Sequence, residues 1–333
     1  MPQCRMATVL ACLMIVGASA WAAASVVPKW SANELTGFAD VIVTGRVTGV
    51  NVGRDASVNA IYTYVDVDVD EVLKGPVSPG ALTIKQLGGS TDGIGLSVVD
   101  QPTFVVGERV LLYLEARPRD GSLYTSALWQ GKWSIEQVGG EGIAVRTEPI
   151  GHRSRSPVDR QRMTAVRTRS AALGRSRAAL VNPVPADAAA AVTRPYALLG
   201  PYRYAFSPPV DMQAGGQPGL AGGGVAEVQR AIGKWNAVGA GFQYTVGSVD
   251  GPARCATQQL NNNRVTISFG DPCGEISNFG GTLAIGGSYF ETSGRTTVNG
   301  VVFQQATEGF LINNDSAVAQ TYLRQSGCFA DVQ

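Results

Sequence analysis

The sequence predicts a mainly β N-terminal barrel or sandwich domain, followed by an α/β C-terminal domain that is incomplete. Between residues 41 and 133, short runs of β-branched and aromatic residues alternate with turns built from Gly, Pro and Asp. From Tyr202 onward the pattern indicates one strand, one amphipathic helix and several further strands, an α/β order that lacks its closing helix. An Arg-rich and Pro-rich stretch separates the two parts.

The composition is typical of a globular protein with two domains. The chain has 333 residues, of which 44% are hydrophobic and 16% are charged, and this is enough apolar material for packed cores. Its 27 Lys and Arg residues nearly balance its 26 Asp and Glu residues, so no overall field favours a nucleic-acid partner. We therefore expect no nucleic acid among the partners.

Residues 1–24 are expected to be a cleaved secretory signal peptide. Arg5 precedes an apolar run at residues 7–17, and Ala18-Ser19-Ala20 supplies the small-x-small pattern that signal peptidase requires. Because this apolar run is too short to span a bilayer, no permanent membrane anchor is expected. The sequence therefore predicts a secreted or periplasmic protein.

The β-rich N-terminal domain is expected to span residues 30–148. Residues 65–70 alternate strictly between Val and Asp, so the valines should face a core and the aspartates should face solvent. Carboxylates on alternate strand positions cannot wrap one ion, and we interpret these aspartates as a solvated face. Strands are expected at residues 41–47, 62–72, 81–87, 109–114 and 122–133.

Residues 149–195 are expected to form an exposed linker. Its arginines have almost no acidic partner nearby in the sequence except Asp159, and a Pro-rich and Ala-rich stretch follows them. Within it, only residues 157–173 are compatible with a helix. A nucleic-acid or membrane patch would need interleaved aromatics or an amphipathic apolar face, which this segment lacks.

The C-terminal domain is expected to span residues 196–333. A helix is expected at residues 225–238, with one buried stripe formed by Val225, Val228, Ile232 and Trp235. Glycine clusters such as Gly286-Gly287 are interpreted as turns, because they lack the lysine and the strand-loop-helix setting of a phosphate-binding loop. Strands are expected at residues 202–207, 242–246, 265–269, 281–290, 301–304 and 310–313.

The cysteines predict one disulfide. Cys4 and Cys12 belong to the signal peptide, which leaves Cys255, Cys273 and Cys328 in an exported chain, where disulfides persist. Cys255 and Cys273 flank a polar loop and form the natural pair. Cys328 is then either a free thiol or half of a bridge whose partner lies outside this sequence.

Groups for catalysis are scarce in the sequence. His152 is the single histidine and lies in the Arg-rich linker, which excludes a multi-histidine zinc site and a Ser-His-Asp or Cys-His set within the two domains. No catalytic residue, no metal ligand and no cofactor are therefore assigned to these 333 residues.

The C-terminal part, roughly residues 196–333, resembles the matrixin-like metzincins, which are secreted zinc endopeptidases. The resemblance is carried by the order of five segments: residues 231–236 (Ala-Ile-Gly-Lys-Trp-Asn), 241–244 (Gly-Phe-Gln-Tyr), 265–270 (Val-Thr-Ile-Ser-Phe-Gly), 280–284 (Gly-Gly-Thr-Leu-Ala) and 329–332 (Phe-Ala-Asp-Val). The β-rich N-terminal domain also resembles modules that precede such peptidases in exported bacterial proteins, and it shows no cysteine-switch sequence.

The resemblance implies a protein or peptide substrate and a strand that receives it. In that family, the segment matched by Gly281, Thr282, Leu283 and Ala284 leads into the edge strand of the sheet, which binds the substrate backbone by strand addition. It also implies that the chain ends just before the H-E-x-x-H helix, so that zinc is expected only for a full-length family member. Ile285 stands where many relatives carry a histidine for a structural zinc.

Two functions from different classes follow. In the first, the chain is the N-terminal part of an exported zinc-dependent endopeptidase of matrixin-like type and is inactive as given. In the second, it is a complete, non-catalytic secreted binding or surface module.

Overall fold

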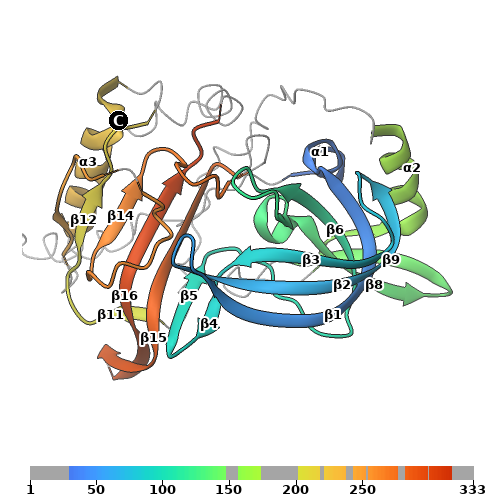
Figure 1. Cartoon of the computed structure of the whole chain (residues 1–333), viewed down its shortest axis with the longest axis horizontal. Coiled ribbons are helices and arrows are strands. Elements are labelled where there is room, and N and C mark those ends of the chain that lie inside the picture. The colour runs from blue at the N-terminus through green and yellow to red at the C-terminus, as the bar shows by residue number, and fades with distance from the viewer. Residues whose placement is uncertain are drawn as a thin grey trace, which may run out of the picture.

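The computed structural model describes residues 30–147, 157–173, 202–217, 221–237, 243–252, 254–276, 282–298 and 300–316, and these form a mainly β structure. Two large sheets lie side by side, one closed into a barrel and one open (Figure 1). In the ranges described, no helix has the length and apolar character needed to cross a membrane.

The N-terminal part is a closed five-stranded barrel, so the predicted barrel or sandwich is a barrel. Its strands follow the order β1-β2-β3-β7-β6, and β6 pairs back onto β1. All neighbours are antiparallel except β3 and β7. The fourth barrel strand, β6, thus lies beside the first, which is Greek-key topology. These strands are β1 (Val41–Asp55), β2 (Ala60–Lys74), β3 (Gly80–Leu87), β6 (Arg109–Ala116) and β7 (Leu123–Thr125).

The barrel interior confirms the alternation predicted for residues 65–70. Val65, Val67 and Val69 are buried in a core that also contains Ile84 and Leu112. The aspartates between them lie on the other face of β2 and are exposed or half-buried.

The barrel sheet continues past β6 through β8 (Lys132–Val138), β9 (Glu141–Thr147) and β10 (Pro157–Arg162). Helices α1 (Ala32–Phe38) and α2 (Met163–Leu173) pack with this extension around Trp133 in a second core. The strand expected at residues 122–133 is broken, because Ala127 and Leu128 take left-handed φ angles and a short 3-10 turn, Leu128–Gly131, separates β7 from β8.

Residues 157–173, which we assigned to the linker, pack on the barrel sheet. Met163 and Val166 are buried in the core around Trp133. Arginines that lack acidic neighbours in the sequence find them in space, because Arg167 binds Glu71 at 2.8 Å and Arg160 binds Glu136 at 2.8 Å. The remainder of residues 149–195 lies outside the described residues.

The second sheet is built mainly from the C-terminal part and has the order β13-β12-β14-β16-β15-β5-β4, with β11 pairing on β16. Strands β11 to β14 and β16 run parallel where they pair, and β15 is antiparallel to β16. The two strands expected at residues 301–304 and 310–313 are one strand. The bounds are β11 (Tyr202–Tyr204), β12 (Pro209–Met212), β13 (Thr245–Val246), β14 (Val265–Ser268), β15 (Ala284–Val298) and β16 (Val301–Asn313).

Helix α3 (Val225–Ala237) follows a short turn, Ala221–Gly224, and connects β12 to its parallel neighbour β13. Val225, Val228 and Ile232 pack against the apolar face of the sheet, but they are half-buried where a buried stripe was expected. Trp235, the fourth member of that stripe, is 43% exposed, so the stripe is one turn shorter than expected.

The two sheets meet through a hairpin that belongs to the N-terminal part by sequence. Its strands, β4 (Gly89–Thr91) and β5 (Ile94–Val98), lie between the barrel and β15 (Figure 1). Strand β5 pairs antiparallel with β15 and extends the second sheet. A single apolar cluster contains Leu87 and Leu128 of the barrel part together with Tyr289 and Phe310 of the second sheet. The barrel and the second sheet therefore share a core.

Candidate functional site

The substrate-binding segment implied by the family resemblance lies at this junction. Thr282, Leu283 and Ala284 are 3%, 4% and 4% exposed, and Ala284 is the first residue of β15. Gly281 lies outside the described residues. The Asn314 side chain donates to the Thr282 carbonyl at 2.9 Å, and the Asn314 backbone N–H donates to the Leu283 carbonyl at 2.8 Å. The segment is thus tied to the end of β16.

Strand β15 is not at the edge of the sheet, contrary to the expectation from the family. Strand β5 covers its outer side and β4 follows as the next strand. Gly286 and Gly287 lie inside β15 and do not form a turn. A Cβ at Gly287 would come within 2.6 Å of the Ser97 carbonyl oxygen, so the close approach of β5 requires glycine there.

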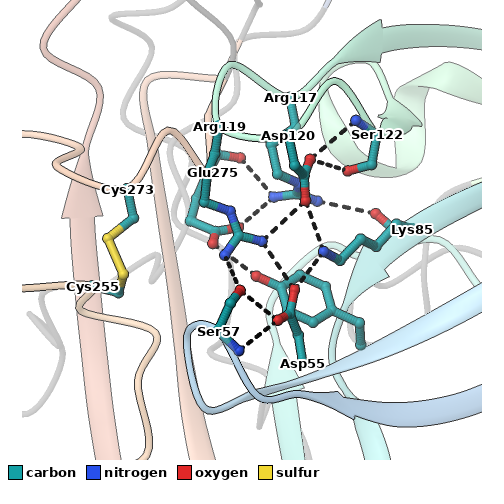
Figure 2. A network of polar contacts seen from close by, with 11 residues as sticks. Asp55, Ser57, Lys85, Arg117, Arg119, Asp120, Ser122, Cys255, Cys273 and Glu275 are labelled. Atoms are coloured by element: carbon teal, nitrogen blue, oxygen red, sulfur yellow. Dashed lines mark hydrogen bonds and ion pairs between the residues drawn. A yellow bond between two sulfur atoms is a disulfide. The ribbon is translucent and has the colours of Figure 1, made fainter.

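A buried carboxylate joins the two sheets. Glu275, in the loop after β14, has a side chain that is 0% exposed and ion-paired with Arg117, whose side chain is 2% exposed. The Tyr62 hydroxyl donates to Glu275 Oε1 at 2.7 Å, and Arg117 Nη1 also donates to the Glu275 carbonyl at 3.1 Å. Burial and the charge of Glu275 raise the pKa of Tyr62, which keeps its hydroxyl a donor. Figure 2 shows Arg117 and Glu275 within a larger polar network.

That network continues on the barrel surface through one lysine and two aspartates. Lys85 Nζ lies 2.7 Å from Asp55 and 2.8 Å from Asp120, and Arg119 lies 3.2 Å from both carboxylates (Figure 2). Partial burial acts to raise the pKa of each aspartate, but hydrogen bonds from Lys85 and from a neighbouring serine outweigh it. The pKa values of Asp55 and Asp120 therefore lie well below their usual range.

The predicted disulfide is present beside this network. Cys255 and Cys273 are bonded, with their Cα atoms 5.3 Å apart (Figure 2). The bond anchors the loop that carries Glu275 two residues later. Gly274, between them, has a φ of 61°, and a Cβ there would lie 3.0 Å from the Arg119 backbone nitrogen. Glycine is therefore needed for the loop to reach the barrel.

A second contact holds the disulfide loop to the turn between β1 and β2. The backbone N–H of Gln259 donates to the Asn59 carbonyl at 3.1 Å, and the Asn59 side chain donates to the Gln259 carbonyl at 2.8 Å. The loop is thus clamped to the barrel at two points.

Asp271 lies in the same loop as Glu275, and its pKa is shifted in the opposite direction to the pKa values of Asp55 and Asp120. Its carboxylate accepts the Ile276 backbone N–H at 2.6 Å. Burial, with added repulsion from Glu275 and Asp315, raises the pKa of Asp271 to about 6.

The described residues at the junction of the barrel and the second sheet form no large pocket and no metal-binding cluster. A hollow at the junction, lined in part by Arg117, Glu275, Thr282 and Ile285, has a cavity volume of about 10 Å³. This is room for about one water molecule and not for a small ligand. Within the ranges described, no group of three or more His, Cys, Asp or Glu side chains is placed to hold a metal. His152 lies outside them, and Ile285 is buried in the shared apolar core. The Ile285 side chain has no atom that can bind a metal ion.

None of the protein-family models, curated proteins or solved structures compared with this chain matches it. The resemblance of residues 196–333 to the matrixin-like metzincins therefore stays a prediction from the sequence.

The sequence reading missed the buried network. The sequence pattern predicts only a turn at Arg119, Asp120 and Gly121, and it assigns no role to Glu275. The one available signal was the placement of Glu275 two residues after a disulfide cysteine, which fixes the loop but does not indicate its partner.

Removal of the Glu275 carboxylate should leave the Arg117 guanidinium buried without a counter-charge. We expect Glu275→Ala to lower the free energy of unfolding by about 3–5 kcal/mol, measured by urea denaturation. Glu136→Ala, which breaks the exposed pair with Arg160, is the matched control and should cost about 1 kcal/mol or less. Equal costs for the two variants would contradict the role assigned to Glu275.

Asp271 should make stability depend on pH between about 4 and 6. Its pKa is about 6 in the folded chain and about 3.9 when unfolded, so the folded state binds the proton more tightly. The free energy of unfolding should fall as pH rises through this window, and the loss should be complete above it. Asp271→Asn should abolish this part of the pH dependence; identical profiles for the two proteins would disprove it.

Loss of the disulfide should cost about 3 kcal/mol, because the bond closes a loop between residues 18 apart. Reduced and oxidised protein should differ by this amount in urea denaturation. Non-reducing peptide mapping should recover Cys255 and Cys273 in one cross-linked pair, and free alkylation of both thiols would refute the assignment.

Proposed function

We propose that this chain is the N-terminal part of an exported zinc-dependent endopeptidase of matrixin-like type, with the barrel docked on the peptidase sheet. The observation that carries the proposal is that β15 already receives an extended antiparallel segment on its outer side. This is the mode of binding that the resemblance implies for a substrate at the strand entered by Thr282, Leu283 and Ala284.

The architecture of the second sheet supports the same proposal. Helix α3 joins β12 to a parallel neighbour, and β14 and β16 continue the parallel set. The antiparallel strand β15 then flanks β16. This α/β arrangement agrees with the order of strands and helix on which the resemblance rests. Among the described residues, no three His, Cys, Asp or Glu side chains are placed together to hold a zinc ion, and we assign no catalytic step to them.

A non-catalytic secreted binding module is the second candidate. It is favoured by the shared core and by the buried Arg117–Glu275 pair, which bind the barrel to the sheet and keep β15 covered. In this case the covered strand would be purely structural.

The two candidates differ in what should follow Gln333 in the gene. The peptidase proposal predicts an H-E-x-x-H motif in one of the three reading frames, shortly after the codon for Gln333. The 333-residue chain should neither bind stoichiometric zinc nor hydrolyse casein, because one histidine cannot supply three ligands. The chain extended through the motif should do both, and chelation should abolish hydrolysis. Absence of the motif from all three frames would refute the peptidase proposal.

A further inference from the structure

We propose that the β4–β5 hairpin is an internal ligand of the outer side of β15, which it occupies as an extended polypeptide would and thereby keeps closed. The inference rests on the proposed function for the identity of this surface as the substrate-binding strand. In this proposal the β4–β5 hairpin of the N-terminal part blocks the outer side of β15. The sequence of the hairpin then indicates which kind of peptide segment this side of β15 can bind.

The backbone pairing covers the first half of β15. Five residue pairs run antiparallel, from Gly287 opposite Val98 to Glu291 opposite Ile94. The pairing is extended at one end by a bond from the Val99 N–H to the Gly286 carbonyl at 3.1 Å. At the other end, the Thr292 N–H and hydroxyl both donate to the Gly93 carbonyl, at 2.9 and 3.0 Å. These bonds satisfy an edge that would otherwise present unpaired groups.

The side chains of β5 indicate which residue types fit against the outer side of β15. Leu96 and Val98, on alternate positions, are 2% and 8% exposed and are buried in the shared core. A Cβ at Gly95, between Ile94 and Leu96, would overlap the Phe290 ring. The surface therefore fits an extended segment that runs antiparallel to β15, with apolar residues at alternate positions and glycine opposite Phe290.

The hairpin is held in place by the barrel. The Gly88 N–H donates to the Ile61 carbonyl at 2.9 Å, and the Thr63 hydroxyl donates to the Gly88 carbonyl at 2.8 Å. Gly88 and Gly89 both have positive φ angles, which lets the chain leave β3 and enter β4. The buried Arg117–Glu275 pair holds barrel and sheet together at the same junction. Opening of this surface therefore requires that the hairpin leave its place against β15.

The test uses the 333-residue chain with residues 89–99 replaced by a short Gly-Ser linker, which removes the hairpin and leaves the barrel strands intact. A second variant, Gly95→Leu, keeps the hairpin but places a side chain against the Phe290 ring. Gly93→Asn is the matched control, because a Cβ at Gly93 meets nothing within 4 Å and asparagine tolerates its positive φ. Circular dichroism checks that each variant is folded.

The probe is a fluorescein-labelled peptide with the sequence of residues 92–100, and binding is followed by fluorescence anisotropy. We expect the hairpin-replacement and Gly95→Leu variants to bind it about tenfold or more tightly than the original chain and Gly93→Asn do. A peptide with Leu in place of Gly95 should not bind.

Other outcomes would overturn the inference. Folded variants that do not bind the peptide would show that the surface is no polypeptide site. Variants that form dimers without binding it would show that the surface prefers a second copy. Loss of fold in both variants would show that the hairpin is only structural. Because peptide binding needs no zinc, it can succeed where the search for the zinc motif fails, and the reverse also holds.

Discussion

The carboxylate of Glu275 is the group on which the union of barrel and sheet depends. A charge placed in a protein interior must be fully compensated, and here the compensation comes from the other half of the molecule, through Arg117 and Tyr62. The disulfide and the turn at Gly274 bring the carboxylate within reach of the barrel. Loss of either partner alone would leave the other charge buried without compensation, so the pair fixes how the barrel and the sheet must meet.

The contact between the barrel and the second sheet bears on the predicted division into two domains. The sequence suggests two domains joined by a linker, but the β4–β5 hairpin crosses from the first part into the second sheet. The apolar cluster that contains Leu96 and Tyr289 belongs to both parts. Interfaces between independent domains are usually more polar and smaller than a shared core. In the described part of the chain, the barrel and the second sheet therefore have one apolar core in common.

Residue alternation, propensity and periodicity predicted most of the helices and strands, because these elements depend mainly on residues close in sequence. The Val-Asp alternation of β2 was correctly oriented, and most strands and α3 lie where propensity and periodicity place them. The Cys255–Cys273 pair was predictable from cysteine count and export. Two predictions failed because the partner is distant in sequence: a turn was expected at Gly287, which instead lets β5 approach β15, and β15 was expected at an edge. The alternation of residues along a strand predicts which face of the strand is buried, but it does not predict which other strand will pair with it.

The hairpin also has a consequence for how this chain reaches its folded state. Thr292 and Gly93, which bond to each other, are 199 residues apart, so β5 can find its partner only when nearly all of the second sheet has been synthesised. Such long-range pairing is slow, because the entropy of closing the loop must be overcome first. Until then Leu96 and Val98 belong to an unpaired apolar strand, which is prone to aggregate. The pairing of β5 with β15 is therefore expected to be a late step in the folding of this chain.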